Sequence, residues 1–270
     1  MQIGKRNFEI GKHTYVMGIL NITPDSFSDG GRYADIDNAL FRVEEMIKEG
    51  ADIIDVGGES TRPGYEKVSV EEEIRRVVPI VEAIKNRFDV PVSLDTYKSK
   101  VAQAGIEAGA NLINDIWGLK GDANMASVIA MANLPCCLMH NRNEAVYSDY
   151  IADVVSDLEE SLKLAQDAGI TSDRIILDPG IGFAKSYEQN LELINYLEIL
   201  HSFGCPVLLG TSRKSVIGIT LDVPVDERIN GTVATTVMGV MKGCSFVRVH
   251  EIKENVQAIK MTEAILQAGK

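Results

Sequence analysis

The sequence is poor in cationic side chains. Its 270 residues include 27 Lys and Arg against 39 Asp and Glu, which gives a net charge of −12 at pH 7. A surface of this sign repels phosphate backbones and anionic lipids, so nucleic acids and membranes are not expected as partners. Any anionic substrate must therefore be bound by a local cluster of cations.

Cysteine and long apolar runs are scarce as well. No apolar run approaches the roughly 20 residues that span a bilayer, and the N-terminus lacks the apolar core of a signal peptide, so we expect a cytoplasmic protein. The cysteines have no Cys-x-x-Cys spacing and lie in apolar stretches, which predicts buried free thiols. They are Cys136, Cys137, Cys205 and Cys244.

Several catalytic motifs are absent. The sequence contains no G-x-x-x-x-G-K-[ST], no H-E-x-x-H, no G-x-S-x-G, and no G-x-G-x-x-G after the first apolar run. These absences leave nucleotidases, dehydrogenases and zinc proteases without support. A calcium loop starting at Asp25 is rejected because Ile36 stands where the twelfth position needs a glutamate.

The chain is rich, by contrast, in short β-branched runs that alternate with amphipathic segments. The apolar runs predict eight strands, at 15–21, 52–58, 90–96, 111–116, 135–140, 174–180, 205–212 and 245–250. The segments after them place apolar residues three and four positions apart, which is typical of helices with one buried face. The predicted helices are at 37–49, 71–88, 98–108, 123–132, 152–168, 188–202, 226–242 and 252–268.

Strand runs that are apolar on both faces indicate a parallel sheet covered by helices. Because these βα units follow one another without a break in composition, we predict a single domain, 1–270, of the α/β class that folds as a (β/α)8 TIM barrel. The short N-terminal extension, 1–14, is expected to cap the bottom of the barrel. A doubly wound open sheet is the alternative.

Polar side chains end the predicted strands. They are Asn21, Glu59, Ser60, Thr61, Arg62, Asp95, Asn114, Asp115, His140, Asp178, Ser212, Arg213, Lys214, Arg248 and His250. Any one of them is better interpreted as a structural hydrogen bond or ion pair. That interpretation is weak for the whole set, since each unpaired buried group would cost about 1–3 kcal/mol. The set therefore predicts a functional site at the carboxyl ends of the strands.

The charges of this set divide into two groups. The cations Arg62, Lys214, Arg248 and His250 suit a phosphate or pyrophosphate. The carboxylates and amide of Asp95, Asn114 and Asp178 suit a heterocycle that carries amino and ring NH donors. Two long loops, at 22–35 and 58–69, are rich in Gly, Pro, Ser and Asp and are interpreted as lids over the site, the alternative being plain connections.

Seven segments resemble, in order, the signature segments of the dihydropteroate synthase family. They are NITPDSFSDGG (21–31), DVGGESTRPG (55–64), SLDTYK (93–98), INDIWG (113–118), LDPGIGFAK (177–185), GTSRKS (210–215) and RVHE (248–251). The resemblance spans nearly the whole chain. It implies a transferase and sulfonamide target that joins 6-hydroxymethyl-7,8-dihydropterin pyrophosphate to para-aminobenzoate in folate biosynthesis, releasing pyrophosphate. It also implies a homodimer.

The resemblance assigns a role to each candidate site residue. For the pterin it implies Asp95, Asn114, Met139, Asp178, Phe183, Lys214 and Arg248. For the aminobenzoate it implies Phe27, Thr61, Pro63 and Ser215. Pyrophosphate would be bound by Arg62, Arg248 and His250, with Mg²⁺ at Asn21. The implied catalytic residues are Asp25, Arg62, Asp95 and Lys214.

Two rival functions share the barrel. A pterin-binding methyltransferase domain would pass a methyl group from a reduced folate to a corrinoid, and it would not need the pyrophosphate cations. A non-catalytic pterin-binding barrel could lose Asn21, Arg62, Lys214 and Arg248, all of which are present. The chain departs from the family pattern at Ala184, at Val216 and in the segment after His140, none of which has a charged role in the implied site.

Overall fold

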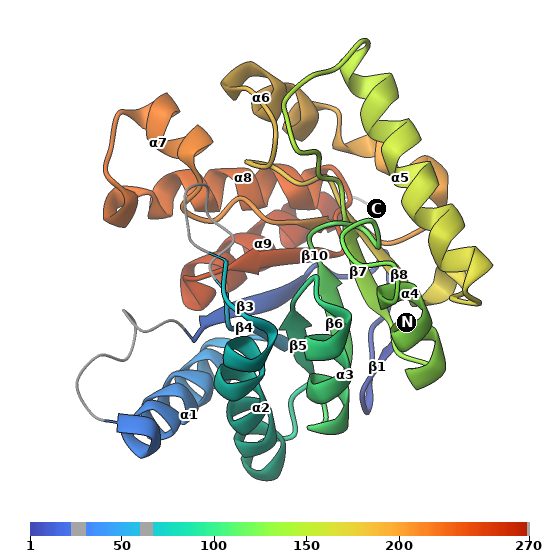
Figure 1. Cartoon of the computed structure of the whole chain (residues 1–270). Helices are drawn as coiled ribbons and strands as arrows, with labels where there is room; N and C mark the ends of the chain where they lie inside the picture. Colours follow the sequence, from blue (N-terminus) through green and yellow to red (C-terminus); the bar gives the residue numbers. More distant parts are fainter. Residues whose placement is uncertain (23–30, 60–66, 269–270) are drawn as a thin grey trace.

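Eight parallel strands form the centre of the molecule (Figure 1). The computed structural model describes residues 1–22, 31–59 and 67–268, with backbone only for 31–35. The strands are β3 (Tyr15–Asn21), β4 (Ile53–Gly57), β5 (Val92–Asp95), β6 (Leu112–Asp115), β7 (Cys136–Met139), β8 (Ile175–Asp178), β9 (Leu208–Leu209) and β10 (Phe246–Val249). Each lies within or equals one of the predicted apolar runs.

The sheet closes on itself. Its order is β8-β7-β6-β5-β4-β3-β10-β9, and Leu177 of β8 forms a parallel bridge with Val207 just before β9. The backbone N–H of Leu177 also donates to the carbonyl of Pro206 at 2.9 Å. Every strand therefore neighbours the next one along the chain, which confirms the predicted (β/α)8 barrel and excludes the open doubly wound sheet.

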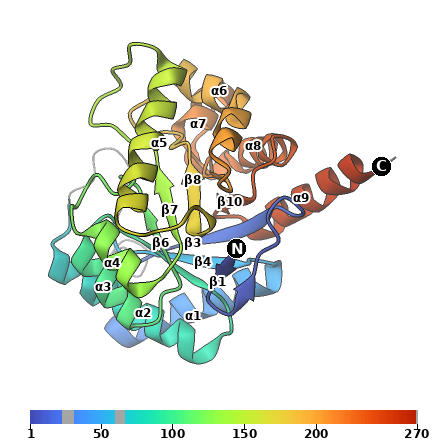
Figure 2. The same cartoon turned by 90° about the vertical axis from the view of Figure 1, so that its right-hand side faces the viewer.

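Helices surround this barrel (Figure 2). They are α1 (Gly31–Glu49), α2 (Val70–Arg87), α3 (Ser99–Glu107), α4 (Met125–Ala132), α5 (Tyr150–Asp167), α6 (Tyr187–Asn195), α7 (Ser215–Leu221), α8 (Ile229–Met241) and α9 (Ile252–Gln267). Short 3-10 turns are η2 (Ser172–Arg174), η3 (Leu197–Phe203) and η4 (Val225–Glu227). No helix in the described ranges is both long enough and apolar enough to cross a membrane.

Three helix predictions need correction. Helix α1 begins at Gly31, so the loop predicted over 22–35 is wrong for its last five residues, which contain no Gly or Pro after Gly31 to prevent a helix. Helix α7 was missed because its seven residues are mostly apolar and β-branched. The predicted helix 188–202 is divided into α6 and η3 at Tyr196.

The N-terminal extension forms a hairpin against the amino ends of the strands, as expected. Strand β1 (Gln2–Ile3) pairs antiparallel with β2 (Arg6–Asn7). Ile3 and Phe8 pack into one apolar cluster with inward-facing side chains of the barrel. These are Met17, Ile53, Leu112, Cys137, Ile176, Leu208 and Phe246. The bottom of the barrel is therefore filled by side chains.

Side chains alternate along each strand between the barrel interior and the surrounding helices. On β6, Leu112 belongs to the interior cluster and Asn114 lines a cavity at the carboxyl end, whereas Ile113 packs in the outer core. All four cysteines are buried and free of disulfides, which confirms that prediction.

Candidate active site

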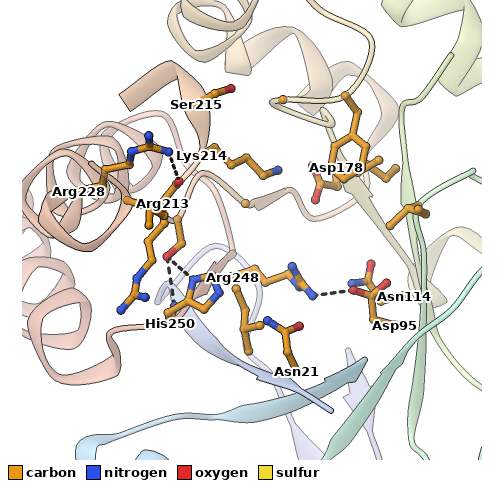
Figure 3. A pocket seen from close by; sticks show the side chains of 18 residues that line it. Asn21, Asp95, Asn114, Asp178, Arg213, Lys214, Ser215, Arg228, Arg248 and His250 are labelled. Atoms are coloured by element: carbon orange, nitrogen blue, oxygen red, sulfur yellow. Dashed lines mark hydrogen bonds and ion pairs between the residues drawn. The ribbon is translucent and has the colours of Figure 1, made fainter. Parts of the chain in front are cut away.

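A cavity of about 300 Å³ lies at the carboxyl ends of the strands (Figure 3). Its lining includes ten of the predicted site residues, contributed by seven different segments of the chain. They are Asn21, Asp95, Asn114, Met139, Asp178, Phe183, Lys214, Ser215, Arg248 and His250. The other predicted residues, Asp25, Phe27, Thr61, Arg62 and Pro63, lie outside the described residues.

Arg248 lines the cavity and bonds two carboxylates. Its Nε donates to Asp55 Oδ2 at 2.6 Å, and its Nη2 donates to Asp95 Oδ2 at 2.6 Å. Asn114 Nδ2 donates to the same Asp55 oxygen at 3.3 Å. Burial opposes the positive charge, but the two carboxylates outweigh it and raise the pKa of Arg248 above its usual value. The arginine is therefore a permanent cation.

Asp95 carries an oxygen that has no partner among the described residues. Its Oδ1 is buried and unbonded, and the same holds for Oδ1 of Asp55. Burial raises the pKa of Asp95 to about 7, because the charge on Arg248 only partly offsets the desolvation and the nearby Asp55 opposes ionisation. A buried acceptor without a donor is costly unless a ligand supplies one.

Asp178 and Lys214 face each other across the loop that follows β8. Asp178 Oδ1 accepts from the Gly180 N–H at 2.7 Å, and burial raises the pKa of this carboxyl despite the opposing charge of Lys214. Lys214 Nζ donates to the Ile181 carbonyl and lies 4.8 Å from the centre of the Phe183 ring. Burial lowers the pKa of Lys214 to about 8, so its proton is easily moved at neutral pH.

His250 and Asn21 form the opposite rim of the cavity. His250 Nδ1 lies 2.9 Å from Ser212 Oγ, and the His250 backbone N–H donates to the same hydroxyl at 3.2 Å. Asn21 ends β3 and directs its side chain toward the cavity near Arg248 (Figure 3). Ser215 is the first residue of α7 and lines the cavity beside Lys214.

Several strand-end residues face away from the cavity. Asp115 accepts from the backbone N–H groups of Trp117 and Leu119, and His140 contacts Asp157 on α5. Arg213 lines the cavity but its guanidinium is paired with Glu251. The expectation that all strand-end polar groups form one site is wrong for Asp115 and His140, since each is the residue that follows an inward-facing one. It is also wrong for Glu59, which does not line the cavity and pairs with Lys98 at 2.6 Å.

Sequence reasoning missed Asp55, because only the ends of the strands were searched. Asp55 lies in the middle of β4 and is fully buried between apolar neighbours. The signal was a lone ionisable residue in an apolar run, two positions after the inward-facing Ile53. Arg228, which donates to the Arg213 carbonyl at 2.9 Å and lines the cavity, was also missed.

No group of three or more His, Cys, Asp or Glu side chains within the described ranges could hold a metal ion. Among the described residues, the lining offers a metal isolated oxygen ligands such as the Asn21 amide. Such a donor set fits Mg²⁺ that is bound mainly by substrate phosphates and water, since this ion keeps several waters in protein sites.

Known proteins are similar to this chain in sequence and architecture. A family model described as "Pterin binding enzyme" matches residues 17–250. The dihydropteroate synthase of Clostridium beijerinckii is 63% identical over 99% of this chain and 100% of its own length. The chain belongs to the dihydropteroate synthase family. The Bacillus subtilis dihydropteroate synthase is 56% identical over 95% of this chain and 90% of its own length.

Solved structures of the dihydropteroate synthase family superpose closely. The enzyme from Clostridium difficile, crystallised in the presence of pteroic acid, has a TM-score of 0.94 and 48% identity and covers 96% of this chain and 99% of its own. The Yersinia pestis enzyme in a sulfonamide drug complex has a TM-score of 0.93 and 41% identity, with 99% of both chains covered. The predicted family, barrel and enzyme class are thereby confirmed.

Proposed function

We propose that this chain condenses 6-hydroxymethyl-7,8-dihydropterin pyrophosphate with para-aminobenzoate in the cavity at the carboxyl ends of the strands, giving 7,8-dihydropteroate and pyrophosphate. The observation that carries the proposal is the division of one cavity into two walls. Asp95, Asn114 and Asp178 offer oxygen acceptors, whereas Arg248 and His250 contribute nitrogen-bearing side chains to the same cavity. A pterin pyrophosphate needs both walls in one molecule.

The acceptor wall suits the amino-pyrimidinone edge of the pterin. Asp178 has one oxygen bonded to Gly180, which leaves the other for an amino group or a ring NH. The Nδ2 of Asn114 is used by Asp55, so its Oδ1 accepts from the ligand. Met139 and Phe183 form apolar sides of the slot, and Lys214 donates to the pterin carbonyl. Asp178 and Asn114 would then each accept a hydrogen bond from the pterin edge.

Arg248 contributes the face of its guanidinium. Two of its in-plane donors, on Nε and Nη2, are used by Asp55 and Asp95, which hold the planar group in one orientation. A planar cation stacks on an aromatic ring, so the pterin lies against this face while the edge of the guanidinium remains paired. Asp55 thereby acts through Arg248, without touching the substrate.

The reaction breaks the bond between the pterin methylene carbon and the pyrophosphate oxygen, and the electron pair leaves on the pyrophosphate. The nitrogen lone pair of aminobenzoate forms the new carbon–nitrogen bond, and that nitrogen then loses a proton to water. The cation that develops on the dihydropterin is stabilised by the fixed carboxylates of Asp95 and Asp178. No strong base is needed, because the aromatic amine is neutral at pH 7.

The leaving group lies at the rim, against His250, Arg248 and Arg62, of which Arg62 is outside the described residues. Asn21 would hold Mg²⁺ through its amide oxygen, and the bound ion would neutralise charge on the pyrophosphate. Ser215 would contact the aminobenzoate carboxylate, and the family resemblance assigns Phe27, Thr61 and Pro63 to the same substrate. The roles of Asp25, Phe27, Thr61, Arg62 and Pro63 stay predictions, as do the single domain, the homodimer and the cytoplasmic location.

The direct test is an assay of pyrophosphate release with dihydropterin pyrophosphate, with and without para-aminobenzoate and with and without Mg²⁺. We expect release to require both additions, with dihydropteroate formed in equal amount. Binding of the pterin without any turnover would overturn the proposal and favour a non-catalytic barrel. Turnover without Mg²⁺ would remove only the metal assignment at Asn21.

A further inference from the structure

Lys185 lies behind the loop that follows β8, on the side away from the cavity. Its Nζ donates to the carbonyls of Gly180 at 2.9 Å and Phe183 at 3.0 Å, and it lies 2.8 Å from His140 Nδ1. Lys185 is not among the residues that line the cavity. The side chain therefore turns back on its own loop instead of reaching the substrate.

His140 is the third acceptor for this ammonium. Its Nε2 lies 2.9 Å from Asp157 Oδ2, so Nε2 carries the proton and donates to the carboxylate. Burial and the charge of Lys185 lower the pKa of His140 to about 3, which keeps the ring neutral and leaves Nδ1 with a free lone pair. Burial also lowers the pKa of Lys185 to about 7, and in the protonated form the three protons of its ammonium meet three acceptors.

Asp157 and Arg142 extend these contacts into a row of four side chains, Lys185, His140, Asp157 and Arg142. Arg142 Nε donates to Asp157 Oδ2 at 2.6 Å, so the same oxygen receives both Arg142 and His140. The row runs from α5 through His140 after β7 to the loop after β8. Because each member has a fixed partner on both sides, the position of the Lys185 ammonium is set by the barrel frame and not by the loop alone.

The loop itself is held from two opposite sides. Lys214 donates to the Ile181 carbonyl from the cavity side. Lys185 donates to the carbonyls of Gly180 and Phe183 from the side away from the cavity. Tyr147 donates to the next carbonyl, at Ala184, at 2.8 Å. Gly180 also has no room for a Cβ, which would lie 2.0 Å from the His140 carbonyl oxygen. The loop is therefore packed directly against the row.

The two lysines differ in what substrate binding does to them. Under the proposed function, Lys214 turns its protons toward the pterin and gives up the Ile181 carbonyl. Lys185 keeps its bonds, since no ligand in the cavity reaches it. The loop then depends on Lys185 at the moment when the Phe183 ring must contact the pterin.

We propose that Lys185, oriented by His140 and Asp157, is a positioning residue that holds the loop 179–184 so that Phe183 and Lys214 meet the pterin. The inference rests on the proposed function and deepens it. It distinguishes Lys185 from the residues that touch the substrate. It also separates pterin binding from aminobenzoate binding, because Ser215 lies on α7 and has no bond to this loop among those described.

The test compares Lys185→Met with Lys120→Met in steady-state kinetics. Lys120 Nζ donates to the Asp157 carbonyl at 3.1 Å and pairs with Glu160 at 3.5 Å, both on α5. Lys120→Met therefore removes a lysine charge next to α5 without removing a bond to the loop 179–184. For Lys185→Met we expect the KM of the pterin pyrophosphate to rise by about tenfold or more. The KM of aminobenzoate at saturating pterin, and both constants of Lys120→Met, stay within about twofold of wild type.

The split between the two KM values separates positioning from a general loss of structure. A purely structural role would reduce the active fraction and hence kcat, with both KM values unchanged, and this result would overturn the proposal. An equal rise in both KM values would overturn it as well. If wild type itself releases no pyrophosphate, the proposed function fails, which is a different outcome from an unchanged pterin KM in an active Lys185→Met enzyme.

Two milder variants decide the matter if Lys185→Met does not fold. His140→Gln removes the imidazole acceptor, and Tyr147→Phe removes the hydroxyl that donates to the Ala184 carbonyl. Each is expected to raise the pterin KM by about threefold or more with the aminobenzoate KM unchanged. Wild-type pterin KM values in both folded variants would overturn the proposal.

Discussion

The two ends of the barrel use the same eight strands to bury opposite kinds of side chain. At the amino ends, Phe8 and Phe246 lie in an apolar cluster in which every member is at most 2% exposed. At the carboxyl ends, the inward-facing positions carry Asp95, Asp178 and Arg248, beside a cavity of about 300 Å³. One end is filled by its own side chains and the other leaves room for a ligand.

The difference assigns stability and function to separate ends. The filled end gains free energy from apolar burial, with Phe8 lying 4.8 Å from Tyr15 and 5.8 Å from Phe246 between ring centres. The open end costs free energy, because burial penalises the charged forms of Asp95 and Lys214. It raises the pKa of Asp95 and lowers the pKa of Lys214. Changes at the first end should therefore alter folding, and changes at the second should alter chemistry.

The largest effect is expected at the filled end. Phe8→Ala leaves a cavity among aromatic rings and should lower the free energy of unfolding by about 3–5 kcal/mol. The kinetic constants per folded molecule should not change. Denaturant titration and assays below the transition measure the two quantities. Ile10→Ala, in the same extension but 37% exposed, is the control and should stay within about 0.5 kcal/mol of wild type. A changed pterin KM in Phe8→Ala would break the comparison.

Asp178→Asn should give the converse result. The amide loses a charged acceptor for the pterin edge, which should weaken pterin binding by about 1.5–3 kcal/mol, or roughly tenfold to a hundredfold. Stability should not fall by more than about 1 kcal/mol, since burial already penalises the ionised carboxyl. Calorimetric titration with a pterin ligand measures the affinity. Asp173→Asn, on the exposed turn before β8, is the matched control. Unchanged affinity in Asp178→Asn would remove it from the acceptor wall.

Asp95 adds a pH dependence that the filled end lacks. Folding raises its pKa from the usual 3.8 to about 7, so the folded protein binds this proton more tightly than the unfolded chain. The resulting stabilisation is complete below about pH 4 and is lost as the pH rises through 7. Over the same range the ionised form that pairs with Arg248 becomes populated, so kcat/KM for the pterin pyrophosphate should rise. Asp95→Asn should flatten both profiles near pH 7, and an unchanged acidic limb would contradict the assignment.

The smallest effect is expected when one asparagine at each end of the barrel is replaced by alanine. Asn21→Ala should shift the Mg²⁺ concentration for half-maximal rate upward by about tenfold, with little change in unfolding. Asn111, at the amino end, accepts from Lys85 Nζ at 3.0 Å and from the Val92 N–H at 3.1 Å. Asn111→Ala should therefore lower stability by about 1–3 kcal/mol and leave the Mg²⁺ curve unchanged. The same shift in both variants would show that Asn21 has no special relation to the metal.

The strands were more predictable than the segments that connect them. The apolar run at 15–21 equals β3, because five buried residues between the half-buried Tyr15 and Asn21 leave little choice of boundary. Helix α7 could not be distinguished from a strand by its composition, and its helical form depends on packing against α8 and α6. The site was predictable for a similar reason. The polar residues that end a strand and face the barrel interior do line the cavity.

The sequence by itself determined the family, the barrel and which residues stand at the carboxyl ends of the strands, because apolar periodicity and motif order are local properties of the chain. Because side chains alternate along a strand, the sequence would also have identified Asp55 as facing the barrel interior and His140 as facing the helices. Only the tertiary structure decided that Arg248 lies between Asp55 and Asp95 and that Lys185 faces His140. These partners come from different strands and loops, so their contacts exist only once the sheet has closed.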